Sequence, residues 1–133
     1  MKRMTVNPDS LFNSRQFGFS QVVVAEPGKI VFISGQVAWD KELNLAGEND
    51  LAKQIQKSLE NLGVAIRAAG GDYENIAMLR IYKVDYKDDD SQVISEALIK
   101  FFGTDNPPAS TFLGVDRLAN SGFMIEIEAQ AVI

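Results

Sequence analysis

The order of periodic segments limits this chain to an α+β domain. Apolar residues recur every three or four positions over residues 50–69, which predicts an amphipathic helix. A second helix is predicted to open at residues 88–91, with acids at the positive end of its dipole, and to close at Gly103. The expected strands are residues 20–25, 30–33, 77–85, 110–115 and 123–132. We expect one domain over residues 1–133, a mixed sheet of about six strands with both helices packed on one face.

The first two strands are predicted to form a hairpin. Residues 22–24 are three consecutive valines, residues 26–29 have turn chemistry, and residues 30–33 are again β-prone. Gly35 predicts an irregularity in the second strand. We expect residues 37–39 to continue that strand beyond it.

The second face of the predicted sheet is apolar, and the chain has no further helix or strand to pack against it. Residues 22–24, 30–33 and 79–84 are apolar on both sides, yet the two helices cover only one face. A homo-oligomer that packs sheet against sheet is the expected solution.

Two absences narrow the possible chemistry. The chain has no histidine and no cysteine, which excludes Ser-His-Asp and Cys-His nucleophiles, imidazole catalysis, disulfides and the usual zinc sites. Catalysis would use carboxylates, Lys, Arg, Tyr, hydroxyls, backbone amides or a bound water. Thirteen basic against eighteen acidic residues give a net charge of −5, which offers no general attraction for nucleic acids or anionic membranes.

The sequence also indicates a location. Lys2 and Arg3 are followed by no apolar run, so a signal peptide is not predicted. No stretch approaches the roughly 20 apolar residues of a membrane helix. We expect a soluble, cytoplasmic protein.

Three polar motifs are candidates for a site, and each has a purely structural alternative. Glu126 and Glu128 share one face of the last strand, as an acid–base pair or as two ordinary strand carboxylates. Ser34-Gly35-Gln36 could hydrogen-bond a ligand or simply mark the strand irregularity. Residues 107–111 could line a small polar pocket or form a rigid turn before a strand.

Other charges suggest structural roles. The acidic residues from Asp85 to Asp90 lack the pattern of a calcium loop, so they are interpreted as a helix N-terminus and no metal site is predicted. Arg80 and Lys83 have opposite strand phase and are either anion anchors or exposed strand charges. The polar face of the first helix is expected to be solvated; its residues are Lys53, Gln54, Lys57, Glu60 and Arg67.

Several collinear segments resemble the Rid proteins (reactive intermediate deaminases, also called YjgF-like and labelled "endoribonuclease L-PSP"). They are Val31-Phe32-Ile33-Ser34-Gly35-Gln36, Ser58-Leu59-Glu60-Asn61-Leu62 running to Ala68-Ala69-Gly70, Ile81-Tyr82-Lys83-Val84-Asp85, Pro108-Ala109 and Ile125-Glu126-Ile127-Glu128-Ala129. The resemblance covers the chain from about Gly18 to its end. It implies the YjgF-like (chorismate-mutase-like) fold, a homotrimer around a central barrel, and active-site clefts between subunits.

The resemblance also implies a reaction and a set of site residues. Imines or enamines such as 2-aminoacrylate are hydrolysed to a keto acid and ammonia, without a metal or an organic cofactor. The family's serine is kept as Ser34 and its water-orienting glutamate as Glu126, the expected catalytic residue. The carboxylate-binding arginine is replaced by Ser110, the cleft tyrosine by Phe19 and the cleft asparagine by Ser95. The substrate-binding residues expected on this basis are Ser34, Gly35, Phe19, Trp39, Ser95, Ala109 and Ser110.

Two functions follow as hypotheses. One is an arginine-less Rid enzyme that hydrolyses a small imine or enamine, with Glu126 orienting water. The alternative is a non-catalytic trimer that binds a small metabolite or a partner protein, since the arginine, tyrosine and asparagine are replaced together. The ribonuclease of the family label is disfavoured, because the chain lacks histidine and carries a net charge of −5.

Overall fold

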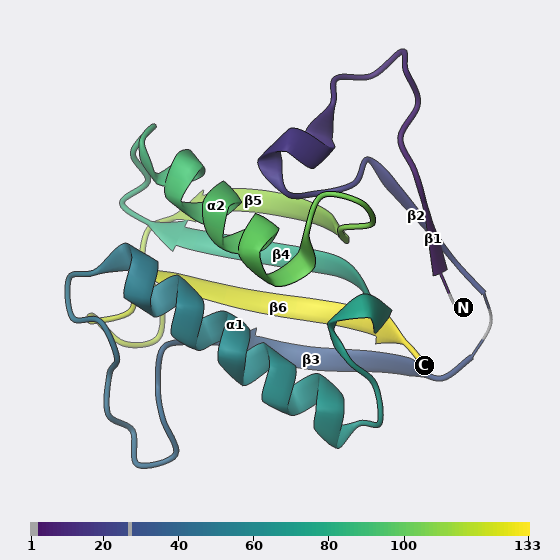
Figure 1. Ribbon diagram of the computed structural model, residues 1–133. Helices are drawn as coiled ribbons and strands as arrows, with labels where there is room; N and C mark the ends of the chain where they lie inside the picture. Colours follow the sequence, from purple (N-terminus) through teal and green to yellow (C-terminus); the bar gives the residue numbers. More distant parts are fainter. Residues whose placement is uncertain (1–2, 27) are drawn as a thin grey trace.

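A four-stranded mixed sheet forms the centre of the molecule. The computed structural model describes residues 3–26 and 28–133. The sheet has the order β3 (Ile30–Gln36), β6 (Ile125–Val132), β4 (Ile76–Val84) and β5 (Ala109–Val115). β6 is antiparallel to both of its neighbours, whereas β4 and β5 are parallel (Figure 1). The α+β class expected from the sequence is confirmed.

Two helices pack on one face of this sheet, as predicted (Figure 1). α1 (Leu51–Ala68) begins after Asp50, whose side chain accepts the backbone N–H of Lys53 at 3.1 Å. α2 (Asp90–Phe102) ends at Gly103, which has a positive φ of 71°. The core between helices and sheet is built mainly from Ile55, Leu59, Leu62, Ile66, Leu79, Ile81, Ile94, Leu98, Ile125 and Ile127. Burial of this apolar stripe is the main source of stability.

The predicted N-terminal hairpin is wrong. β2 (Val22–Ala25) pairs with β1 (Arg3–Val6), a strand that the sequence analysis missed, in a separate two-stranded sheet. β3 pairs with β6 instead, so β6 takes the place beside β3 that the prediction gave to β2. The six strands therefore form sheets of two and four rather than one sheet. Pro27, in the predicted turn, lies outside the described residues.

The strand that contains Gly35 ends earlier than predicted. Its register against β6 shifts between Ile33 and Gln36, which confirms the expected irregularity. Residues 37–39 leave the sheet, because the side-chain amide of Asn61 on α1 donates to two of their carbonyl oxygens, each at 2.9 Å.

The sheet face opposite the helices carries exposed apolar side chains. Ile30 and Phe32 on β3 are 65% and 72% exposed, and Leu113 on β5 is exposed as well. Both helices lie on the other side (Figure 1). The single chain therefore presents the apolar face that the sequence analysis expected to need a cover.

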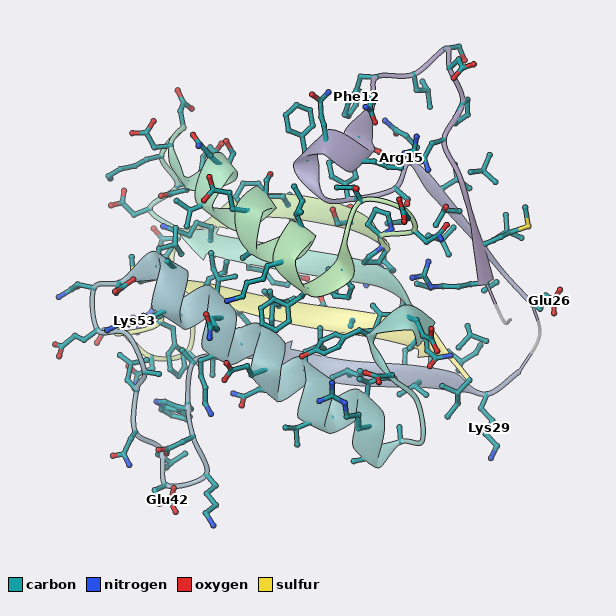
Figure 2. The ribbon with its side chains drawn as sticks, in the orientation of Figure 1. Phe12, Arg15, Glu26, Lys29, Glu42 and Lys53 are labelled. Carbon is teal, nitrogen blue, oxygen red and sulfur yellow. The ribbon has the colours of Figure 1, made fainter. Side chains whose placement is uncertain are left out.

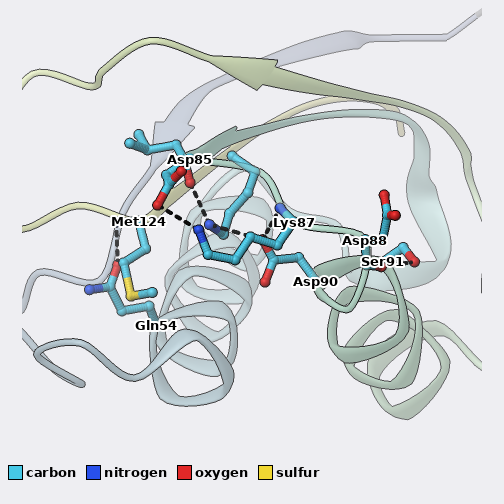
Figure 3. A network of polar contacts seen from close by, with 9 residues as sticks. Gln54, Asp85, Lys87, Asp88, Asp90, Ser91 and Met124 are labelled. Carbon is cyan, nitrogen blue, oxygen red and sulfur yellow. Dashed lines mark hydrogen bonds and ion pairs between the residues drawn. The ribbon is translucent and has the colours of Figure 1, made fainter.

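The expectation that Gln54 is solvated is wrong. Its side chain is fully buried, and its amide donates to the carbonyls of Gly47 at 3.1 Å and Gly122 at 2.9 Å. Its oxygen accepts the N–H of Met124 at 2.9 Å (Figure 3). Gln54 thus ties two loops to the first turn of α1, and its hydrogen bonds offset the cost of burial.

Lys83 is buried, not exposed as one interpretation of the sequence held. Its ammonium group lies 3.2 Å from the Asp90 carboxylate at the start of α2. Lys87 forms a second, exposed ion pair with Asp85 at 2.9 Å (Figure 3). The acidic run thus opens α2, as predicted. No cluster of three or more potential metal ligands occurs in residues 3–26 and 28–133.

The helices also bear on membrane insertion. Among the residues that the structure describes, none of the helices combines the length and the apolar character that crossing a bilayer requires.

Candidate functional site

A cavity of about 600 Å³ lies between α2, β5 and the segment that follows the short 3-10 helix η1 (Ser14–Phe17). Phe19, Ser95 and Ser110 all line it. The structure therefore brings together three of the predicted substrate-binding residues, which stand 15 to 91 positions apart in the sequence. Further lining residues include Gln16, Phe17, Ile81, Gln92, Glu96 and Phe112.

Local backbone geometry places Phe19 in the wall of this cavity. Gly18 ends η1 with a φ of 92°, and a β-carbon there would lie 2.9 Å from the Cβ atom of Leu98. The glycine therefore lets the chain pass close to α2. The backbone N–H of Ser20 then donates to the carbonyl of Pro108 at 2.9 Å, and Ser20 forms a parallel bridge with Ala109. These contacts fix Phe19 beside the start of β5.

The aromatic residues around η1 extend the apolar wall. The ring centroid of Phe12 lies 6.3 Å from that of Phe17 and 6.1 Å from that of Phe19. Phe12 and Arg15 lie on the outer side of this segment (Figure 2). Phe17 and Phe19 line the cavity, so η1 and the residues after it contribute an aromatic part of its wall.

Ser110 and Ser95 reach the cavity from regular elements. Ser110 pairs with Leu79 of β4, so its side chain shares the sheet face that the helices cover. Ser95 follows the buried Ile94 on α2. Both serines are half-buried. Their hydroxyl groups can donate and accept hydrogen bonds at the floor of the cavity.

A second group of predicted residues surrounds Glu126. This side chain lies against Gly35, where a β-carbon would fall 2.7 Å from Glu126 Cγ. Ser34 directly precedes Gly35 in the chain and is exposed. The Tyr82 hydroxyl donates to Glu128, an interaction that raises the pKa of Tyr82. Within the described part of the chain no side-chain hydrogen bond engages Glu126.

The two groups lie on opposite faces of the sheet. Glu126 alternates with the buried Ile125 and Ile127, so it faces away from the helices. Ser110 shares the helix-covered face, on the edge strand farthest from β3. A single chain therefore does not bring Glu126 to the cavity lined by Ser110.

Trp39 belongs to neither group. Its ring packs edge-on against Phe123, with centroids 4.7 Å apart, and its backbone forms an isolated bridge with Leu45. It does not line the cavity of Phe19. In one chain, Trp39 is a packing residue of the loop that follows β3.

A buried arginine was missed by the sequence analysis. The Arg3 guanidinium donates to the carbonyl oxygens of Glu74 at 2.5 Å and Asn106 at 2.9 Å, and burial lowers its pKa. It borders a second cavity, of about 820 Å³, together with Tyr73 and Phe102. A basic residue near a chain terminus carries no sequence signal for such a position.

Comparisons with known proteins agree with this architecture. The model of the family described as Endoribonuclease L-PSP matches residues 14–133. Protein DfrA of Myxococcus xanthus is 31% identical over 114 residues, which are 86% of this chain and 84% of the relative. The human 2-iminobutanoate/2-iminopropanoate deaminase is 29% identical over 114 residues, 86% of this chain and 79% of the relative.

Solved structures give the same result. A Yersinia pestis protein of unknown function, YyfB of the conserved Rid protein family, superposes with a TM-score of 0.96 at 36% identity, and all of both chains is covered. Escherichia coli TdcF, crystallised with bound serine, superposes with a TM-score of 0.70 at 28% identity, with coverage of 82% of this chain and 84% of that chain.

Proposed function

Because this chain belongs to the Rid (YjgF-like, Endoribonuclease L-PSP) family, we propose that it is a homotrimer that binds a small metabolite in clefts between its subunits. The observation that carries the proposal is the cavity lined by Phe19, Ser95 and Ser110. Cavities of this size, mostly apolar with a few polar groups, are typical of small-molecule sites.

The placement of Glu126 supports the trimer. Glu126 and Ser34 lie on the sheet face that one chain leaves uncovered, whereas Ser110 lies on the other face. A neighbouring copy is the economical way to bring a carboxylate opposite the cavity. The exposed Ile30 and Phe32 are on that same uncovered face and would be buried by the contact.

The proposed reaction is hydrolysis of a carbon–nitrogen double bond. Water adds to the carbon of the imine, the C–N bond then breaks, and a carbonyl compound and ammonia are released. Glu126 of the neighbouring subunit would orient and deprotonate the water, while the hydroxyls of Ser95 and Ser110 hold the ligand. No metal or organic cofactor takes part. The deaminase activity in the human relative's name supports this reaction class.

Binding without catalysis is the second candidate. It is favoured by the cavity itself, where Ser110 and Phe19 provide no guanidinium and no phenol to hold a reacting group. The bound serine in the crystal structure of TdcF supports a small-molecule site in this fold.

Two measurements test the proposal. Sedimentation equilibrium is expected to give three times the mass of the chain. With imines formed in situ by an oxidase, the protein is expected to accelerate ammonia release, and Glu126→Gln is expected to lower that rate by about 10²-fold or more. Glu128→Gln is the matched control and is expected to keep most of the rate. Ligand binding without turnover would support the second candidate, and a monomer without binding would contradict both.

A further inference from the structure

The cavity lined by Phe19, Ser95 and Ser110 has no cationic wall, and this limits what it can hold. We propose that its ligand is an uncharged or singly positive amine, amide or imine on an apolar carbon skeleton, without a carboxylate group. This inference rests on the proposed binding role of the same cavity.

The lining residues carry the argument. None of them is lysine or arginine, and the only ionisable side chain among them is Glu96. The other polar groups are neutral serines and glutamines. A carboxylate moved from water into such a site would lose its hydration without gaining a positive partner, which is strongly unfavourable. A neutral amide or imine needs only the hydrogen bonds that the serine hydroxyls can make.

The cations close to the cavity are already engaged or face outward. Lys83 pairs with Asp90 at 3.2 Å, and its side chain is buried. Arg15 neighbours the lining residue Gln16, but it is exposed and lies on the outer side of η1 (Figure 2). Among residues 3–26 and 28–133, no guanidinium or ammonium group lines the cavity.

The N-terminus of α2 does not replace the missing cation. Ser91, in the first turn of this helix, lines the cavity, so the positive end of the helix dipole is near. That end is preceded by Asp88 and Asp89 and begins with Asp90. The carboxylates of Asp88 and Asp89 offset the dipole and repel a further anion, while Asp90 is paired with Lys83.

A cationic nitrogen fits the same surroundings. Glu96 is exposed at the rim, where it accepts a hydrogen bond from the Gln92 amide at 3.1 Å and has further acceptor capacity. The carbon skeleton would then pack on Phe19, Ile81 and Phe112. Hydrolysis of such an iminium ion consumes one water: R₂C=NH₂⁺ + H₂O gives R₂C=O + NH₄⁺. The oxygen of the carbonyl comes from the water, and both of its protons leave on the ammonium ion.

Four ligands that share an isobutyl group test this inference: 3-methylbutan-1-amine, 3-methylbutanamide, 3-methylbutanoate and leucine. Binding to the full chain is followed by the NMR shifts of the Ser95 and Ser110 amides. The amine and the amide are expected to bind at least about ten-fold more tightly than 3-methylbutanoate and leucine. Glu96→Gln is expected to weaken the amine about three-fold at low salt and to leave the amide unchanged. Glu60→Gln, on the exposed face of α1, is the control.

Substitution at the cavity floor provides the reciprocal test. Ser110→Arg supplies a guanidinium and is expected to raise the affinity for 3-methylbutanoate about ten-fold or more. Gln56→Arg adds the same charge on the exposed side of α1, away from the cavity, and is expected to leave the order of affinities unchanged. Tighter binding of 3-methylbutanoate than of 3-methylbutanamide by the unsubstituted protein would overturn this inference while preserving small-molecule binding. If none of the four ligands moves the two amides, the proposed function itself fails.

Discussion

The side chain of Glu126 lies directly against Gly35, and a β-carbon at position 35 would fall 2.7 Å from Glu126 Cγ. Such a separation is shorter than any normal carbon–carbon contact. Position 35 therefore stays without a side chain so that the carboxylate can lie along β3, next to Ser34. The register shift between Ile33 and Gln36 occurs at the same point.

Gly35→Ala is expected to destabilise the fold by about 1–2 kcal/mol, because the new methyl group displaces Glu126. The same substitution in a Glu126→Ala background is expected to cost almost nothing, since the obstacle is gone. A double-mutant cycle by urea denaturation measures this coupling. A Glu128→Ala background is the control and should retain the full cost. Equal costs in all three backgrounds would contradict the contact.

Gln54→Ala is expected to destabilise the protein by about 2–4 kcal/mol, because three backbone groups lose buried partners. Gln56→Ala, on the exposed side of the same helix, is expected to change stability by no more than about 0.5 kcal/mol. Thermal and urea denaturation compare the two variants. Similar effects would mean that the Gln54 amide does not hold the loops at Gly47 and Gly122.

Asp90→Asn is expected to cost about 2–4 kcal/mol, because it leaves the ammonium group of Lys83 buried without its carboxylate. Adding Lys83→Met is expected to recover part of this loss by removing the unpaired charge. Asp85→Asn breaks the exposed pair with Lys87 and is expected to leave the unfolding midpoint nearly unchanged. A double variant less stable than Asp90→Asn alone would contradict the role given to the buried pair.

Tyr73 is expected to make stability fall in alkaline solution. Its hydroxyl donates to the carbonyl of Leu59 at 2.6 Å, and burial raises the pKa of this phenol above its ordinary value. The folded state thus holds the proton more tightly than the unfolded state. The resulting stabilisation is complete below the ordinary tyrosine pKa of about 10 and is lost as the pH rises through the folded pKa.

Tyr73→Phe isolates this effect, because the other ionisable groups titrate in both proteins. The wild type is expected to be about 1 kcal/mol more stable than the variant at pH 8, with a difference that shrinks above pH about 10. Urea denaturation at several pH values measures it. A difference that stays constant up to pH about 11 would show that the phenol proton does not stabilise the fold.

The helices and the main strands were predictable because their signals are local. The stripe of α1 and its Asp50 cap are contained in one segment, and the alternation of β6 already placed Glu126 opposite its buried neighbours. β1 was missed because it has only four residues, and its pairing with β2 bridges some twenty positions of sequence. Gln54 was misjudged because its burial depends on two loops that fold over the start of α1.

The candidate site was predictable only in part. The resemblance to the Rid proteins named Phe19, Ser95 and Ser110, and the structure places them around one cavity. Three further lining residues were not predictable from the sequence, because exposed polar residues carry no periodic signal; they are Gln16, Gln92 and Glu96. Within one chain Trp39 lies outside this cavity, since it packs against Phe123 in a loop that leaves the sheet after Gln36.

A crystal structure of the full protein with 3-methylbutanamide tests the central claim most directly. We expect three chains around their uncovered sheet faces, with the amide bound between Phe19, Ser95 and Ser110 of one chain. We also expect the Glu126 carboxylate of a neighbouring chain to face that ligand. A cavity left empty at saturating amide, or a bound amide that no Glu126 approaches, would contradict the claim.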